Sequence, residues 1–177
     1  MSEKSALIIG HVQPPITDMV TEPEFIPRLQ ETITAARDAG VLVFFIHIGF
    51  DKNLSQLDMF IDGVSNPFHD TIAPTDKDVV IRGAHVSGFL GTDLDLSLRS
   101  QGIQRIVLTG ISTGGVVLGT LTDAVQRGYG VTLLTDLAFD PNPAVHDAIL
   151  KLVGSYGPGL PWGAALQTSA EWKAALS

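Results

Sequence analysis

Leu108-Thr-Gly-Ile-Ser-Thr-Gly-Gly-Val-Val-Leu-Gly-Thr120 is the stretch that decides the fold, because it runs from an apolar segment through a glycine-rich turn into a helical pattern. In a parallel α/β sheet, ligands bind at such junctions, since the N-terminus of the helix presents backbone N–H groups that lack a partner within the helix. The stretch therefore predicts a strand-turn-helix unit and marks the turn as a candidate site.

Short apolar runs alternate with amphipathic stretches on both sides of this unit, which is typical of βα units around a buried parallel sheet. Asn142-Pro143 is a strong helix start, with Asn as N-cap and Pro in the first turn. The pattern predicts strands at 6–11, 41–48, 78–82, 105–110 and 131–136, and helices around 26–36 and at 92–99, 116–127, 142–153 and 169–176.

Two segments depart from this alternation. Residues 49–77 form a long connection with scattered apolar residues, and long loops in compact domains often cover a functional site. Residues 154–162 are rich in Gly and Pro, so we expect irregular structure there. We find no repeat and no internal boundary, and 177 residues suit a single α/β domain over 1–177.

Composition excludes several classes of function. A formal charge of −8, with no basic cluster, argues against a nucleic-acid partner. The longest apolar run, 41–46, is too short to cross a bilayer, and the first residues carry no signal-peptide pattern. The chain has no cysteine, so it has no disulfide, thiolate nucleophile or thiolate metal site. We therefore expect a cytoplasmic protein without membrane partners.

Several motifs, met in the right order, resemble those of the isochorismatase-like (cysteine hydrolase) family. They cover residues 5–150, and the resemblance implies a three-layer α/β/α sandwich with a mainly parallel, Rossmann-like sheet. The matching motifs are Ala6-Leu-Ile-Ile-Gly-His-Val-Gln13, Val86-Ser-Gly-Phe-Leu-Gly-Thr-Asp-Leu94, Ile106-Val-Leu-Thr-Gly-Ile-Ser-Thr113, Asp123-Ala124, Gly128-Tyr129 and Thr135-Asp136.

The same resemblance implies an Asp-Lys-Cys triad, and this chain departs from it at all three positions. The Asp falls on His11, the Lys on Gly83 and the Cys on Val116. A valine cannot form an acyl intermediate, so the amidase mechanism of the family is excluded on chemical grounds. Family members that act on vinyl ethers rely on the Asp instead of the Cys, and that route is compromised because the Asp is missing too.

His11 is the leading catalytic candidate, because it lies at the carboxyl end of the first predicted strand and an imidazole transfers protons near neutral pH. The competing interpretation is a histidine held by hydrogen bonds without a catalytic role. The resemblance also implies a cis Ile111–Ser112 bond and an oxyanion-binding turn at the N–H groups of Val116 and its neighbours. The candidate substrate-binding residues are Gln13, Arg82, His85, Phe89, Ser112, Thr113, Gly115 and Val116.

Other sites receive less support from the sequence. The turn at 110–115 lacks the Gly-x-Gly-x-x-Gly spacing of a dinucleotide loop, so we expect no cofactor. His69, Asp70 and Asp51 show no Asp-x-His spacing, so we expect no metal. His47 suits the core as well as a ligand contact, and His146 is expected on the surface of the last long helix.

Two functions remain open at this point. The first is a family hydrolase-like enzyme that acts on a small carboxylate-bearing or oxygenated metabolite by cysteine-independent acid/base chemistry. The second is a non-catalytic descendant that binds a small molecule or a protein partner through the old cleft. The apolar tail around Leu160-Pro-Trp162 and the long loop predict a homo-oligomer, as the resemblance also implies.

Overall fold

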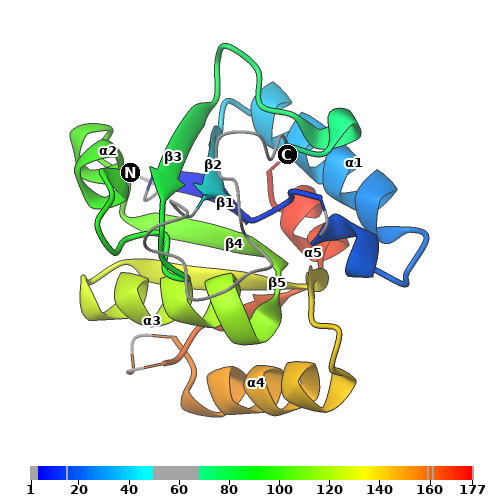
Figure 1. Cartoon of the computed structure of the whole chain (residues 1–177). Coiled ribbons are helices and arrows are strands. Elements are labelled where there is room, and N and C mark those ends of the chain that lie inside the picture. Colours follow the sequence, from blue (N-terminus) through cyan, green and yellow to red (C-terminus); the bar gives the residue numbers. More distant parts are fainter. Residues whose placement is uncertain (1–3, 15, 50–67, 159, 161, 177) are drawn as a thin grey trace.

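The structure is a computed structural model that describes residues 4–14, 16–49, 68–158, 160 and 162–176. Across these residues, six parallel strands form one sheet in the order β3-β2-β1-β4-β5-β6 (Figure 1). The strands are β1 (Ser5–Gly10), β2 (Leu42–Ile48), β3 (Val79–Gly83), β4 (Arg105–Ile111), β5 (Gly130–Phe139) and β6 (Ala165–Gln167).

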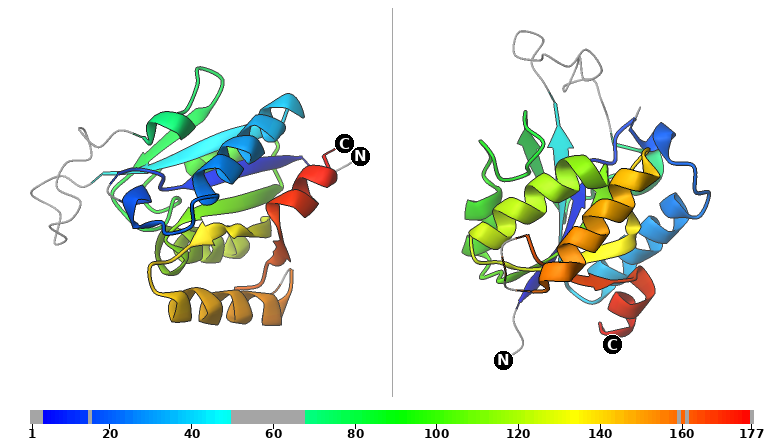
Figure 2. Two further views of the ribbon diagram at one scale, coloured as in Figure 1. Left: turned by 90° about the vertical axis from the view of Figure 1, so that its right-hand side faces the viewer. Right: turned by 90° about the horizontal axis from the view of Figure 1, so that it is seen from below.

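Helices cover both faces of the sheet and make the three layers that the sequence predicts. They are α1 (Phe25–Asp38), α2 (Leu94–Ser100), α3 (Leu118–Gln126), α4 (Pro143–Tyr156) and α5 (Ser169–Ala174). Buried side chains of α1 and α5 pack on one face of the sheet, and those of α2, α3 and α4 pack on the other. In the left view of Figure 2, α1 and α4 accordingly lie on opposite sides of the sheet.

Strand alternation explains why two cores form. In β1, Ala6 and Ile8 face the core under α2 and α3, whereas Leu7 and Ile9 face the core under α1. Both pairs are fully buried, because a central parallel strand is covered on both faces. The near-continuous apolar runs in the sequence reflect this double burial.

Most predicted elements are confirmed, with shifts at their ends. The Asn142 side chain caps α4 by accepting the N–H of Ala144 at 3.1 Å, as the Asn-Pro signal indicates. β5 is longer than predicted and reaches Phe139. A short π-helical turn, η4 (Thr113–Val117), precedes α3, so the backbone starts to coil before the predicted start at residue 116.

The prediction for the tail is partly wrong. Residues 154–156 continue α4, which ends before Gly157, a residue with φ 67°. Gly154 does not stop the helix, because the face that carries Ile149 and Val153 is buried. Residues 165–167 form β6, a strand too short to leave an apolar pattern, which pairs with Thr132, Leu133 and Leu134 of β5. Most of the long connection 49–77, from 50 to 67, lies outside the described residues.

The close approach of β1 and β4 requires glycine at residue 110. Gly110 lies opposite Gly10 in the sheet register and has φ 144°. A Cβ atom on Gly110 would lie 1.9 Å from the carbonyl oxygen of Gly10. Because this clash is with the backbone, a rearrangement of side chains cannot remove it.

We expect Gly110→Ala to destabilise the protein far more than Gly40→Ala. Gly40 also has positive φ (71°), but its Cβ would meet nothing within 4 Å, so it reports backbone strain alone. Strain of that kind costs about 1–2 kcal/mol, whereas the backbone clash at Gly110 should cost more than about 4 kcal/mol or prevent folding. Urea denaturation of both variants measures this, and equal losses would contradict the proposed close approach.

Candidate functional site

The candidate site lies where the sheet order reverses. From β1 the chain moves outward through β2 to β3, then returns to place β4 on the other side of β1. The loops that leave the carboxyl ends of β1 and β4 therefore diverge, and such a switch point is where open α/β sheets bind ligands. His11 follows Gly10 at the end of β1, and Ser112 follows Ile111 at the end of β4. Gly10 and Gly110 are partners in the sheet register, so these two strand ends are neighbours.

Strand β3, which carries the candidate residue Arg82, lies away from this point. β2 stands between β1 and β3, and β3 forms one edge of the described sheet. Arg82 lies opposite His47 in the register and is exposed, and Gly83 lies opposite Ile48. The cationic end of β3 is therefore separated from the end of β1 by one strand.

His11 adopts a left-handed backbone conformation, with φ 69°. Residues other than glycine are uncommon there, and Asn, Asp and His are several-fold enriched among them. The resemblance places an Asp at this position, so the observed His is one of the few replacements that the backbone admits. The local geometry therefore limits which titratable groups can occupy the end of β1.

The His11 side chain is buried, 4% exposed, and its Nδ1 atom lies 3.0 Å from Oε1 of Gln13. Gln13 is fully buried, and the same Oε1 accepts the backbone N–H of Ile48 at 2.9 Å. Burial lowers the pKa of His11 to about 4, and the nearby His47 imidazole contributes to the lowering. His11 is therefore neutral at physiological pH.

Two residues of the long connection reach the same region. The N–H of His69 donates to the carbonyl of Val12 at 3.0 Å. The ring of Phe68 meets the His47 ring edge-on, with centroids 5.2 Å apart. The C-terminal part of the connection thus packs beside the ends of β1 and β2, while Asp51 lies outside the described residues.

The glycine-rich turn contains the cis Ile111–Ser112 peptide that the resemblance implies. Its N–H groups are largely engaged within the protein. Gly115 and Val117 both donate to the carbonyl of Ser112 at 3.2 Å, and Gly114 donates to the Asp140 carboxylate at 2.8 Å. Gly114, Gly115 and Val117 thus use their N–H groups within the protein, and the oxyanion-binding role expected of the turn stays a prediction.

Val116 faces the core. It is 1% exposed and belongs to the apolar cluster under α2 and α3. Its two methyl groups would lie 3.2 Å from a Cβ on Gly10, so the side chain sits directly against the end of β1. The structure thus places Val116 against Gly10, the residue before His11, and buries it among apolar side chains.

The sequence interpretation missed two polar residues that hold the turn. Nδ1 of His146 lies 2.9 Å from Oγ1 of the fully buried Thr113, and Asp140 accepts the N–H of Gly114. His146, expected on the surface, is half-buried. The available signal was its spacing, since 146 shares one helical face with the buried Ile149 and Val153.

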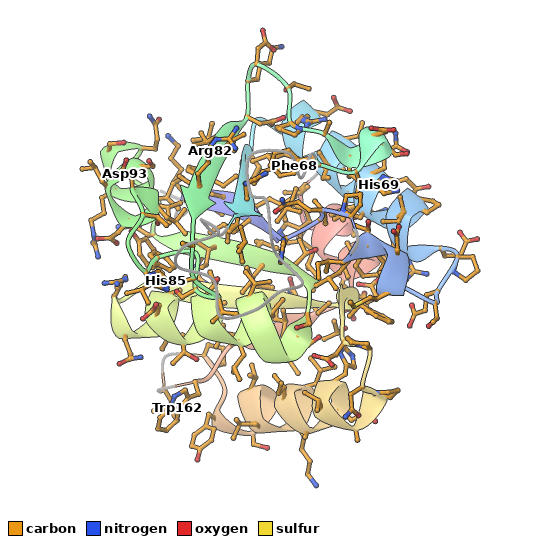
Figure 3. All side chains as sticks on the ribbon, in the orientation of Figure 1. Phe68, His69, Arg82, His85, Asp93 and Trp162 are labelled. Carbon is orange, nitrogen blue, oxygen red and sulfur yellow. The ribbon has the colours of Figure 1, made fainter. Side chains whose placement is uncertain are left out.

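Phe89 and His85 do not join the site at the end of β1. Phe89 is 4% exposed and packs against Tyr129, with ring centroids 5.8 Å apart. Tyr129 directly precedes β5, so Phe89 reaches the opposite end of the sheet from His11. His85 is exposed, and Figure 3 shows its side chain apart from that of Arg82. The predicted contact with substrate is therefore corrected for Phe89, whose side chain belongs to the core.

The described residues also bear on metal sites and on membrane-spanning segments. No three His, Asp or Glu side chains within 4–14, 16–49, 68–158, 160 and 162–176 come together in a way that could hold a metal ion. In the same part of the chain, every helix is too short or too polar to cross a membrane.

Comparison with known proteins gives a consistent match over the whole fold. A family profile described as the isochorismatase domain matches residues 5–165. An isochorismatase family protein of Bacillus subtilis (strain 168) is 29% identical over 162 residues, which make up 85% of this chain and 86% of that protein.

Solved structures show the same fold at lower identity. An isochorismatase family protein from Burkholderia thailandensis superposes with a TM-score of 0.83 and 24% identity, over 99% of this chain and 97% of that one. N-carbamoylsarcosine amidase from Thermoplasma acidophilum superposes with a TM-score of 0.74 and 23% identity, over 94% of this chain and 96% of that one.

We expect the stability of the protein to fall as the pH drops from about 6.5 to about 4. The folded-state pKa of His11 is about 4 and its ordinary value is 6.5, so the unfolded chain binds the extra proton in that window. The difference corresponds to about 3 kcal/mol at the low end of the window.

His11→Asn should remove this component, because Asn tolerates the same backbone conformation but does not titrate. The free energy of unfolding is measured by urea denaturation at pH 4.5, 5.5 and 7 for wild type, His11→Asn and the exposed control His85→Asn. A His11→Asn protein with the same pH slope as the wild type would contradict the assignment.

Proposed function

Since the chain belongs to the isochorismatase family, we propose that it is a hydrolase-like enzyme that acts on a small metabolite without a cysteine nucleophile. In this proposal His11 transfers the proton, and the substrate is a small molecule that carries a carboxylate or another oxygen-rich group. The match of the family profile over residues 5–165 supports the hydrolase fold. Because the chain has no cysteine, its reaction has to differ from that of the family members that use a cysteine nucleophile.

The observation that carries the proposal is the placement of His11. His11 is the residue that follows β1, at the switch point of the sheet. The turn that follows the neighbouring strand β4 begins beside it. The ring is held by Gln13, and an imidazole can pass a proton to or from a bound molecule without a covalent intermediate.

Three of the other candidate residues are accessible enough to contact a substrate, and a fourth is buried. Ser112 and Gly115 are half-buried at the turn, and the exposed Arg82 offers a permanent positive charge at the same edge of the sheet. Thr113 is fully buried against His146, so its proposed part is to hold the turn in place. In this proposal, the positive charge of Arg82 attracts a carboxylate of the substrate.

The test is a comparison of His11→Asn with the wild type on small substrates. The panel contains N-carbamoylsarcosine, which is named for a structural neighbour, and isochorismate, which is named for the family. We expect hydrolysis of one panel member or a related small molecule by the wild type and a loss of at least about 100-fold in His11→Asn. Circular dichroism confirms that the variant is folded, and a variant that hydrolyses the substrate at the normal rate would show that His11 does not transfer the proton.

We expect Val116→Cys to give no amide hydrolysis above background. The thiol would lie at a helix N-terminus, which lowers its pKa only modestly. Without a Lys at Gly83 and an Asp at His11 it has no partners, and such groups act as a unit. Turnover of N-carbamoylsarcosine by the purified variant is the measurement, with Val117→Cys as the matched control one residue along. Hydrolysis specific to Val116→Cys would contradict the claim that the lost partners are essential.

One observation favours the non-catalytic alternative. The Val116 side chain fills the space against Gly10 and is 1% exposed, so an apolar group occupies the position that the resemblance gives to the nucleophile. A binding protein would retain a metabolite through several purification steps and release it unchanged. Mass spectrometry of the denatured protein separates the two functions, because an enzyme would release a product that differs from the molecule supplied.

We further propose that the protein self-associates through an apolar surface at the end of α4. Tyr156 and Trp162 contact one another with ring centroids 6.0 Å apart, and Leu166 packs at Gly154. Because each chain carries a formal charge of −8, two copies repel except where they meet through uncharged side chains. The exposed members of this surface are Leu152, Tyr156, Leu160, Trp162 and Leu166.

Trp162→Gln should therefore shift the protein toward the monomer. Aromatic anchors dominate interface energies, and losing one typically costs more than about 2 kcal/mol of association. Light scattering across a concentration series measures the change, with Leu96→Gln, an exposed apolar residue on α2, as the control. A wild-type protein that stays monomeric at all concentrations would defeat the proposal.

A further inference from the structure

The hydrogen-bond geometry around Gln13 determines which nitrogen of His11 carries the proton. The backbone N–H of Ile48 donates to the Gln13 side-chain atom Oε1 at 2.9 Å. A peptide N–H bonds only to an acceptor, so the atom that it meets is the amide oxygen and not the amide nitrogen. The orientation of the Gln13 amide is therefore fixed by the main chain of β2.

The same oxygen fixes the imidazole in turn. Nδ1 of His11 lies 3.0 Å from Oε1 of Gln13. An amide oxygen accepts hydrogen bonds and never donates one, so Nδ1 has to carry the hydrogen for the contact to be favourable. Both side chains are buried, Gln13 fully, so the Nδ1–Oε1 contact is shielded from bulk water.

We propose that Gln13 is a positioning residue that holds His11 in its Nδ1-protonated tautomer and thereby makes Nε2 the proton acceptor. The inference rests on the proposed function of His11 and gives it a direction. A neutral imidazole carries one ring hydrogen, so fixing it on Nδ1 leaves the lone pair on Nε2. His11 then begins the reaction as a base.

The proton path follows from this tautomer. In a hydrolytic step, Nε2 takes a proton from water, and the oxygen of that water uses the released electron pair to form a bond to the electrophilic carbon of the substrate. The bond to the leaving group then breaks, and Nε2 returns the proton to that group. Gln13 accepts the Nδ1 hydrogen bond throughout, which stabilises the transient imidazolium. The low pKa of His11 agrees with a ring that is deprotonated before substrate arrives.

The chain offers a matched set of variants for Gln13. Gln13→Met keeps the unbranched shape but removes the acceptor for both Nδ1 and the Ile48 N–H. Gln13→Glu keeps an acceptor at the same place and adds a negative charge. Gln126→Met serves as the control, because Gln126 is exposed and its amide donates only to the Thr122 carbonyl of its own helix at 3.2 Å.

The measurement is the two ¹⁵N shifts of the His11 ring in the full chain at pH 7, assigned by the signal that His11→Asn lacks. We expect the wild type and Gln126→Met to show Nδ1 protonated and Nε2 unprotonated in at least about tenfold excess, the size of one net hydrogen bond. In Gln13→Met the Nε2-protonated form should increase at least about tenfold. Gln13→Glu should keep the Nδ1 hydrogen and raise the pKa of His11.

The outcomes separate this inference from the proposed function. A wild type with Nε2 protonated, or a tautomer unchanged in Gln13→Met, would overturn the role of Gln13 whatever the activity. If Gln13→Met does not fold, the wild-type shifts and the raised pKa in Gln13→Glu still decide. An Nδ1-protonated ring in a protein whose His11→Asn variant keeps full turnover would support the positioning while removing the catalytic role.

Discussion

The contact between Gly10 and Gly110 is the constraint on which the site depends. Gly10 ends β1 and Gly110 is the penultimate residue of the neighbouring strand β4, and a Cβ at 110 would meet the carbonyl oxygen of Gly10 at 1.9 Å. Because the strands stay close to their ends, the residues that follow them lie side by side, His11 on one side and Ser112 on the other. The Val116 methyl groups occupy the space next to Gly10 where a larger residue would have its Cβ.

The three positions at which the chain departs from its family each have a local physical explanation. Position 11 has positive φ, which suits Asp and His alike. Position 83 is crowded, because a Cβ there would lie 2.8 Å from Cγ2 of Thr92. Val116 is fitted into an apolar core. The surroundings of positions 83 and 116 therefore match the residues that now occupy them.

The sequence sufficed for the helices and for β1 to β5, because these depend on apolar periodicity, capping residues and short motifs. It missed β6, since three residues leave no apolar pattern, and the location of the site stays a prediction. It did not reveal the contacts that join distant segments. Asp140 and His146 hold the turn from 26 and 33 residues away, and no local pattern encodes such pairings. Phe89 was misplaced for the same reason, since its motif says nothing about the direction in which the ring points.

The two hydrogen bonds from Thr113 and Gly114 to His146 and Asp140 make the turn and the start of α4 one mechanical unit. The other end of that helix carries Tyr156, part of the apolar surface. A molecule bound at the turn and a second chain on α4 would act on the same rigid body. Linkage is reciprocal, so if a molecule bound at the turn changes the affinity between chains, assembly changes the affinity for that molecule by the same factor.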